Sequence, residues 1–258
     1  MRARLPDRAS TIPPHAPDAG RFAHVEDWVF DLDNTLYPQT ADLWPKIDAR
    51  ITLFMMRLFG LDAISLRALQ KHYYLRYGTT LRGLMEEHGV DAENYLRYVH
   101  AIDRSSLAPD HFLARAIAAL PGRKLILTNG SRAHAVETAR RLGIDHLFAD
   151  VFDIIAADFI AKPHEAAYER FFQRLNIDPR RAAIFEDLDR NLVVPHRRGM
   201  TTVLVLPPHG AGPERETWEI ASGDEPHVDF VTDDLAGFLE GLAQNRSQVL
   251  SHALSKSR

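Results

Sequence analysis

The chain has 258 residues, of which 45% are hydrophobic and 26% charged, a composition typical of a globular protein with one large α/β domain and a smaller inserted one. A formal net charge of −4 argues against a nucleic-acid polymer as partner, and no apolar run approaches the roughly 18–20 residues that a membrane span needs. The chain contains no cysteine, which excludes disulfides and thiolate chemistry and fits a cytoplasmic location.

The first ordered element is expected at Glu26–Phe30, after a flexible lead-in at residues 1–24 that is rich in Arg, Pro and Ala. Its short apolar run suits a strand buried on both faces of a parallel sheet. The polar residues of Asp31–Thr35 then predict a loop at the carboxyl end of this strand.

Residues 39–109 have the pattern of a small all-helical module. Trp44, Ile47 and Ile51 recur at steps of three and four, which places them on one face of a helix, and Gly60 follows as a stop signal. The same pattern repeats further along, and no strand pattern interrupts it. We therefore expect a helical cap inserted after the first strand.

From residue 110 onward, strands and helices alternate. Short apolar strands are expected at Lys124–Leu127, Val151–Ala156, Ala182–Phe185, Thr202–Leu206 and Phe230–Val231. This alternation predicts a doubly wound, Rossmann-like α/β core with a mostly parallel sheet. The core comprises residues 25–38 and 110–244, and residues 245–258 form a loose C-terminal tail.

Residues with reactive side chains follow the expected core strands at their carboxyl ends, where such sheets bind ligands. They are Asp31, Asp33, Thr35, Thr128, Lys162, Glu186 and Asp187. Clustered carboxylates repel one another unless a lysine or a hard cation neutralises them, and a set of oxygen ligands suits Mg²⁺. With that screening, one aspartate of the Asp31–Asp33 pair can attack a phosphate while the other handles the leaving-group proton.

Four segments resemble the motifs of the haloacid dehalogenase (HAD) superfamily. Phe30–Tyr37 is similar to its first motif, Leu127–Gly130 to the second, Lys162–Pro163 to the third and Ile184–Asp187 to the acidic fourth. The resemblance covers essentially the whole expected fold. It implies a Mg²⁺-dependent phosphatase that forms an aspartyl-phosphate.

The resemblance also implies a role for each matched residue. Asp31 is the nucleophile and Asp33 the general acid/base. Mg²⁺ is held by Asp31, the backbone carbonyl of Asp33 and Asp187, with Glu186 acting through water. The phosphoryl oxygens are bound by Thr128, Asn129 and Lys162. Asp189 is an extra acid where related chains often carry a small or neutral residue.

The expected cap contains a finer likeness. Residues 72–84 resemble the pyrimidine 5′-nucleotidase group of the superfamily, which implies a nucleoside 5′-monophosphate as substrate. The residues that would stack on or hydrogen-bond to the nucleotide are Tyr77, Thr79, Thr80 and Arg82. The alternative is that the same residues close a turn and pack two helices together.

Other activities stay open from the sequence. A phosphatase for another small phosphate ester, such as a sugar or vitamin phosphate, needs the same motifs, and a phosphomutase also keeps Asp33. Haloacid dehalogenation is disfavoured because it needs neither a metal nor an acid at the position of Asp33. A non-catalytic binding scaffold is disfavoured because it has no use for so costly a charge cluster. The sequence does not indicate the oligomeric state.

Overall fold

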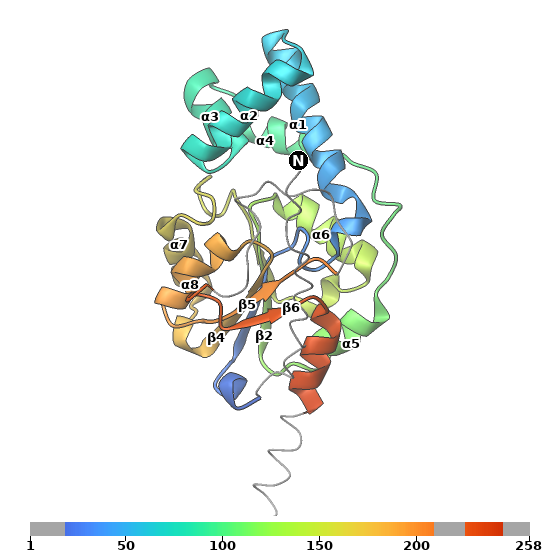
Figure 1. Cartoon of the computed structure of the whole chain (residues 1–258), viewed down its shortest axis with the longest axis vertical. Helices are drawn as coiled ribbons and strands as arrows, with labels where there is room; N and C mark the ends of the chain where they lie inside the picture. Colours follow the sequence, from blue (N-terminus) through green and yellow to red (C-terminus); the bar gives the residue numbers. More distant parts are fainter. Residues whose placement is uncertain (1–18, 209–224, 245–258) are drawn as a thin grey trace, which may run out of the picture.

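The computed structural model describes residues 19–208 and 225–244 (Figure 1). The expected tail at 245–258 and most of the lead-in therefore lie outside the described residues. Residues 19–24 differ from the expectation of a flexible lead-in. Ala19–Phe22 forms a short 3-10 helix, η1, and Phe22 is fully buried with its ring stacked on Trp28 at a centroid distance of 6.0 Å. The fold thus begins earlier than the apolar run of the first strand suggests.

The core is a parallel six-stranded sheet in the order β3-β2-β1-β4-β5-β6. Its central strand β1 pairs with β2 on one side and β4 on the other, so that Asp27 lies opposite both Arg123 and Ala182. The strands are β1 Asp27–Phe30, β2 Arg123–Leu127, β3 Asp150–Phe152, β4 Ala182–Glu186, β5 Thr201–Val205 and β6 Phe230–Thr232. This arrangement confirms the doubly wound, Rossmann-like α/β core.

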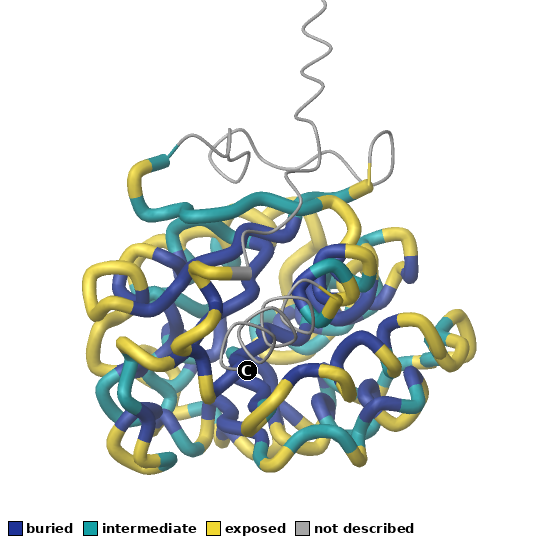
Figure 2. The backbone as a smooth tube through the Cα atoms, turned by 90° about the horizontal axis from the view of Figure 1, so that it is seen from below, coloured by how far each residue is buried: buried dark blue, intermediate teal, exposed yellow. Residues whose placement is uncertain are grey.

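Side chains alternate between the two faces of the sheet along each strand, and both faces are apolar. Helices cover both of them. Trp28 and Phe30 of β1 contribute to one hydrophobic cluster, and Val29 to the other. The first cluster is covered by α5 His111–Ala119, α6 Arg132–Leu142 and the helical residues 235–244, the second by α7 Glu165–Leu175 and α8 Val193–Arg197. Figure 2 shows the buried backbone in the middle of the molecule with exposed segments around it.

Strand β3 is shorter than the expected Val151–Ala156 because Asp153 turns the chain. One oxygen of the Asp153 carboxylate accepts from the backbone N–H of Ala156 at 2.9 Å, and the other from that of Arg132 at 2.8 Å. A side chain that bonds to the backbone three residues ahead favours a turn over a continuing strand. The loop that follows β3 therefore starts at Asp153 and leads to Lys162.

Four helices between β1 and β2 form a group that we call the helical insert. They are α1 Leu43–Phe59, α2 Ala63–Tyr77, α3 Thr80–His88 and α4 Ala92–Val99. The insert has its own hydrophobic cluster, which also takes in Ile154 and Ala161 from the loop after β3. It lies at one end of the molecule, above the sheet in Figure 1. No helix in the described part of the chain has the length and apolarity to cross a membrane.

Candidate active site

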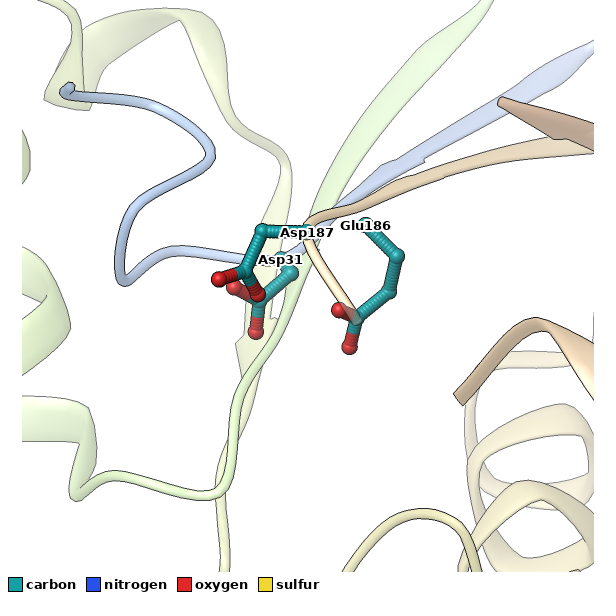
Figure 3. A group of neighbouring side chains, drawn as sticks. All are labelled: Asp31, Glu186 and Asp187. Carbon is teal, nitrogen blue, oxygen red and sulfur yellow. The ribbon is translucent and has the colours of Figure 1, made fainter. Parts of the chain in front are cut away.

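Two neighbouring strands of the sheet deliver three buried carboxylates to one place. Asp31 follows β1, and its backbone N–H donates to the carbonyl of Phe185 at 2.9 Å, which continues the pairing of β1 with β4 by one residue. Glu186 ends β4 and Asp187 follows it. One carboxylate oxygen from each of Asp31, Glu186 and Asp187 lies within 4.8 Å of the others, and we call this group the carboxylate cluster (Figure 3).

Lys162 lies between two of these carboxylates. Its buried ammonium donates to Asp31 Oδ1 at 2.6 Å, to Glu186 Oε1 at 2.6 Å and to the carbonyl of Leu127 at 3.0 Å. Burial lowers the pKa of Lys162, but the charges of Asp31 and Glu186 outweigh this effect and hold its pKa above the ordinary value. The lysine therefore stays protonated and offsets part of the negative charge that the sheet edge concentrates.

The proton affinity of Asp31 is unusual for an aspartate. Burial raises the pKa of Asp31 to about 7 against the opposing charge of Lys162, and the carboxylates of Glu186 and Asp33 contribute to the increase. Displaced pKa values of this kind concentrate at sites that perform chemistry or bind ions. Additional positive charge is therefore needed to keep Asp31 ionised near neutral pH.

Glu186 is committed to protein contacts. Its Oε1 accepts from Lys162 and from Asn191 Nδ2 at 2.7 Å, and its Oε2 accepts from the backbone N–H of Leu188 at 3.0 Å. Two donors on one oxygen leave that atom no free lone pair. Glu186 thus holds Lys162 in place, and Asp31 and Asp187 are the better placed direct metal ligands.

The donor set suits a hard divalent cation. The three carboxylates offer only oxygen, which Mg²⁺ prefers over nitrogen or sulfur. Asn191, whose Nδ2 donates to Glu186, has a buried oxygen, Oδ1, with no hydrogen-bond partner among the described residues. Buried polar atoms normally have partners, so an ion with its water fits this arrangement. Asp189 lies outside the carboxylate cluster, with an oxygen 3.9 Å from His227 Nε2.

Asp33 differs from its neighbour Asp31 in its contacts. Its Oδ1 accepts from His134 Nε2 at 2.9 Å and from the hydroxyl of Tyr37, and 17% of its side chain is exposed. Burial raises the pKa of Asp33, but the hydrogen bonds from His134 and Tyr37 act against burial and hold this pKa below its ordinary value. The two aspartates of one loop therefore have pKa values far apart, which is the pattern expected of groups with different roles.

The loop after β2 carries two of the residues that were predicted to contact phosphate. Thr128 is buried, and its hydroxyl accepts from the backbone N–H of Gly130 at 2.9 Å. The side-chain amide of Asn129 instead binds the backbone of Lys162, accepting from its N–H at 2.9 Å and donating to its carbonyl at 3.2 Å. The Asn129 amide, predicted to contact phosphate, is thus occupied in positioning Lys162.

Three of the four nucleotide-contact candidates have side-chain partners inside the helical insert. The Tyr77 hydroxyl donates to Glu87 at 2.6 Å, Thr79 accepts from a backbone N–H as the N-cap of α3, and Arg82 pairs with Glu86. Thr80 is buried. The structure does not join them to the carboxylate cluster. Their segment nevertheless borders the Lys162 loop, since a Cβ built at Gly78 would lie 3.2 Å from His164 Nε2.

Three residues that contact the site were missed from the sequence. Tyr37 ends the first motif, so its position beside Asp33 was available from the pattern. His134 lies in the first turn of α6, directly after the loop of Thr128. Arg104 lies on the return from the helical insert, and no sequence signal marks its contact with His134.

Comparisons with known proteins agree with this fold. A family model described as haloacid dehalogenase-like hydrolase matches residues 29–192. Phosphate metabolism protein 8 of Saccharomyces cerevisiae is 29% identical over 174 residues, which is 61% of this chain and 53% of that protein. The chain thus spans about half the length of this curated relative.

Solved structures with the same fold include two L-2-haloacid dehalogenases. The dehalogenase PA0810 has a TM-score of 0.52 and 18% identity, covering 87% of this chain and 99% of that one. The enzyme from Xanthobacter autotrophicus with covalently bound chloropropionic acid has a TM-score of 0.51 and 19% identity, covering 85% and 97%. At such identities the likeness shows the fold, and the activity has to be argued from the residues of the site.

Proposed function

Because the chain belongs to the haloacid dehalogenase-like hydrolases, we propose that it is a Mg²⁺-dependent phosphomonoester hydrolase acting through an aspartyl-phosphate on Asp31. The observation that carries the proposal is the second aspartate, Asp33, which has one oxygen anchored by His134 and Tyr37 beside the carboxylate cluster. A halide leaves as a stable anion, whereas an alkoxide needs a proton from such an acid. Dehalogenation would use neither Asp33 nor a cation.

The site residues account for both chemical steps. Asp31 attacks phosphorus through the oxygen that Lys162 does not hold, the ester P–O bond breaks, and Asp33 gives its proton to the departing oxygen. Asp33 then takes a proton from water, which attacks the aspartyl-phosphate and releases inorganic phosphate and free Asp31. Because its pKa is lowered, Asp33 is a carboxylate in the free site. It takes its first proton from solvent water when the negative charge of the bound substrate raises that pKa.

Asp31, Asp187 and the backbone carbonyl of Asp33 would hold Mg²⁺, which supplies positive charge against the repulsion between a carboxylate and a phosphate dianion. Lys162 supplies a second positive charge on the same side of the site. Together they offset the electrostatic cost of bringing substrate to a buried carboxylate cluster.

For the substrate, we favour a nucleoside 5′-monophosphate, with a pyrimidine base preferred. The support is the resemblance of residues 72–84 to the pyrimidine 5′-nucleotidase group, and the closeness of Gly78 in that segment to the Lys162 loop. Another small phosphate ester and a phosphomutase reaction are the alternatives within the same chemistry.

The test is phosphate release from a panel of nucleoside monophosphates and sugar phosphates, with Mg²⁺ and with EDTA. Release that depends on Mg²⁺ and is highest for UMP or CMP is expected. Preference for another ester would agree with the proposed phosphatase chemistry but would exclude a nucleoside monophosphate as the preferred substrate. A mutase would return an isomerised monophosphate with little free phosphate. Asp31→Asn should abolish turnover in a folded protein, and activity retained in that variant contradicts the mechanism.

A further inference from the structure

The two oxygens of the Asp33 carboxylate have different surroundings. Oδ1 accepts hydrogen bonds from His134 Nε2 at 2.9 Å and from the Tyr37 hydroxyl. Among the described residues, no hydrogen bond to Oδ2 is found. Since part of the Asp33 side chain is exposed, a proton to be transferred can be carried by Oδ2, while Oδ1 stays an acceptor.

Arg104 fixes which nitrogen of His134 carries the hydrogen. Its Nη2 lies 2.8 Å from His134 Nδ1, and a guanidinium nitrogen can only donate. Nδ1 must therefore accept, and the ring hydrogen is on Nε2, where it points at Asp33. The result is a chain of directed hydrogen bonds from Arg104 through His134 to Asp33.

Arg104, at the start of this series of hydrogen bonds, is itself held rigidly. Arg104 also donates to the carbonyls of His100 and Ile102 at 3.1 and 3.2 Å and to the hydroxyl of Thr138 at 3.3 Å. The ring of His100 stacks on that of His134 at a centroid distance of 4.4 Å with an interplanar angle of 13°. His134 is completely buried, so its ring has little freedom to turn away from Asp33.

We propose that Arg104 and His134 are positioning residues for proton transfer, which hold Asp33 by Oδ1 so that Oδ2 faces the leaving-group oxygen. The inference rests on the proposed phosphatase function. As the bond from Asp31 to phosphorus forms and the ester P–O bond breaks, the proton passes from Asp33 Oδ2 to the departing oxygen. The carboxylate so formed keeps the hydrogen bonds from His134 and Tyr37 on Oδ1, and both donors keep their hydrogens.

A purely structural role makes a different prediction about leaving groups. If the hydrogen bonds from Arg104 through His134 to Asp33 only supported folding, removing them would slow the hydrolysis of all substrates alike. If these hydrogen bonds orient Asp33 as the general acid, removing them slows only the hydrolysis of esters whose leaving group needs a proton. Dinitrophenolate departs without a proton, whereas phenolate does not. The ratio of two rates measured on one preparation is also independent of the fraction of protein that is folded.

The experiment measures kcat/KM, which reports the steps up to cleavage of the ester bond, for 2,4-dinitrophenyl phosphate and phenyl phosphate in Mg²⁺. For His134→Ala we expect a loss of about 100-fold on phenyl phosphate and less than about threefold on the dinitrophenyl ester. Asp33→Asn should show the same selectivity. His134→Gln, whose amide N–H can replace Nε2–H, should recover much of the loss.

His88→Ala is the matched control, since His88 bonds to Tyr73 in the helical insert at 2.7 Å. His88→Ala should change the ratio of the two rates by less than about twofold, far less than the change expected when general-acid catalysis is lost. Equal losses on both esters in His134→Ala, or no recovery in His134→Gln, would overturn the inference while leaving the phosphatase proposal standing. A wild-type protein that cleaves neither ester with Mg²⁺ refutes the proposed function and this inference with it.

Discussion

Lys162 holds the charge balance of the carboxylate cluster. It is the group that donates to both Asp31 and Glu186, and all three side chains are buried. A buried ion pair that loses one partner leaves an uncompensated charge in a medium that solvates it poorly. The residue proposed to bind the phosphoryl group is therefore also one on which stability depends.

Replacing Lys162 with methionine should lower the free energy of unfolding by about 3–5 kcal/mol at pH 8. Adding Glu186→Gln to Lys162→Met removes one of the two buried carboxylates that lost their partner, and it should recover part of the lost free energy of unfolding. Urea unfolding followed by circular dichroism measures both effects, with Arg67→Met on the exposed surface of α2 as control. Unchanged stability in Lys162→Met would show that the carboxylates are neutralised in another way.

The raised pKa of Asp31 makes Mg²⁺ binding depend on pH. An acid with a pKa of about 7 is protonated below that value, and a cation can bind only its carboxylate form. Mg²⁺ affinity should therefore rise as the pH passes upward through 7 and level off above it, with binding at pH 6 about tenfold weaker than at pH 8. Isothermal calorimetry at the two pH values measures this, and equal affinities contradict it.

At the scale of elements, helix ends were the most predictable features. Gly60, Gly78 and Gly89 each follow a helix of the insert with positive φ, a conformation in which glycine is unstrained. The meeting of Lys162 with the carboxylate cluster was also predictable, because parallel strands bring their carboxyl ends to one edge whatever lies between them. Arg104 and His134 were not, since their meeting depends on how the return from the insert packs against α6.

Gly83 shows how closely α2 and α3 approach. A Cβ built at this position would lie 2.5 Å from ring atoms of Tyr73 and 2.7 Å from the Tyr73 Cβ, which cannot swing away. Gly83→Ala should therefore lower the free energy of unfolding by about 1–3 kcal/mol despite the better helix propensity of alanine. Thermal unfolding tests this against Glu86→Ala on the exposed face of α3, and a stabilised Gly83→Ala would disprove the tight contact.

At the scale of the whole molecule, the helical insert meets the core beside the site. The guanidinium of Arg190, close after Asp187, lies over the ring of Tyr74 in α2 at 4.8 Å. The turn at Gly78 lies against the loop that carries Lys162, as the nearness of Ala161 shows. We propose that the insert acts as a cap, which moves away to admit substrate and closes to exclude water.

A cross-link offers a direct test, because the natural chain has no cysteine. A Cβ at Gly78 would lie 3.9 Å from the Cβ of Ala161, within the roughly 3.5–4.5 Å that a disulfide spans. In Gly78→Cys/Ala161→Cys, oxidation should reduce turnover at least about tenfold, and a reductant should restore it, if opening is required. The two single variants are controls for local strain, and full activity of the cross-linked protein would exclude a moving cap.

The position of β1 at the centre of the sheet also affects how the chain is made. β1 precedes the other five strands of this sheet along the chain, yet Arg123, the partner of Asp27 in β2, lies 96 residues later, and β4 follows later still. The helices of the insert, whose contacts are local, can form during this interval, whereas strand pairing over such distances is slow. Of the six strands, this one, which ends up with a partner on each side, therefore waits longest with both of its edges unpaired.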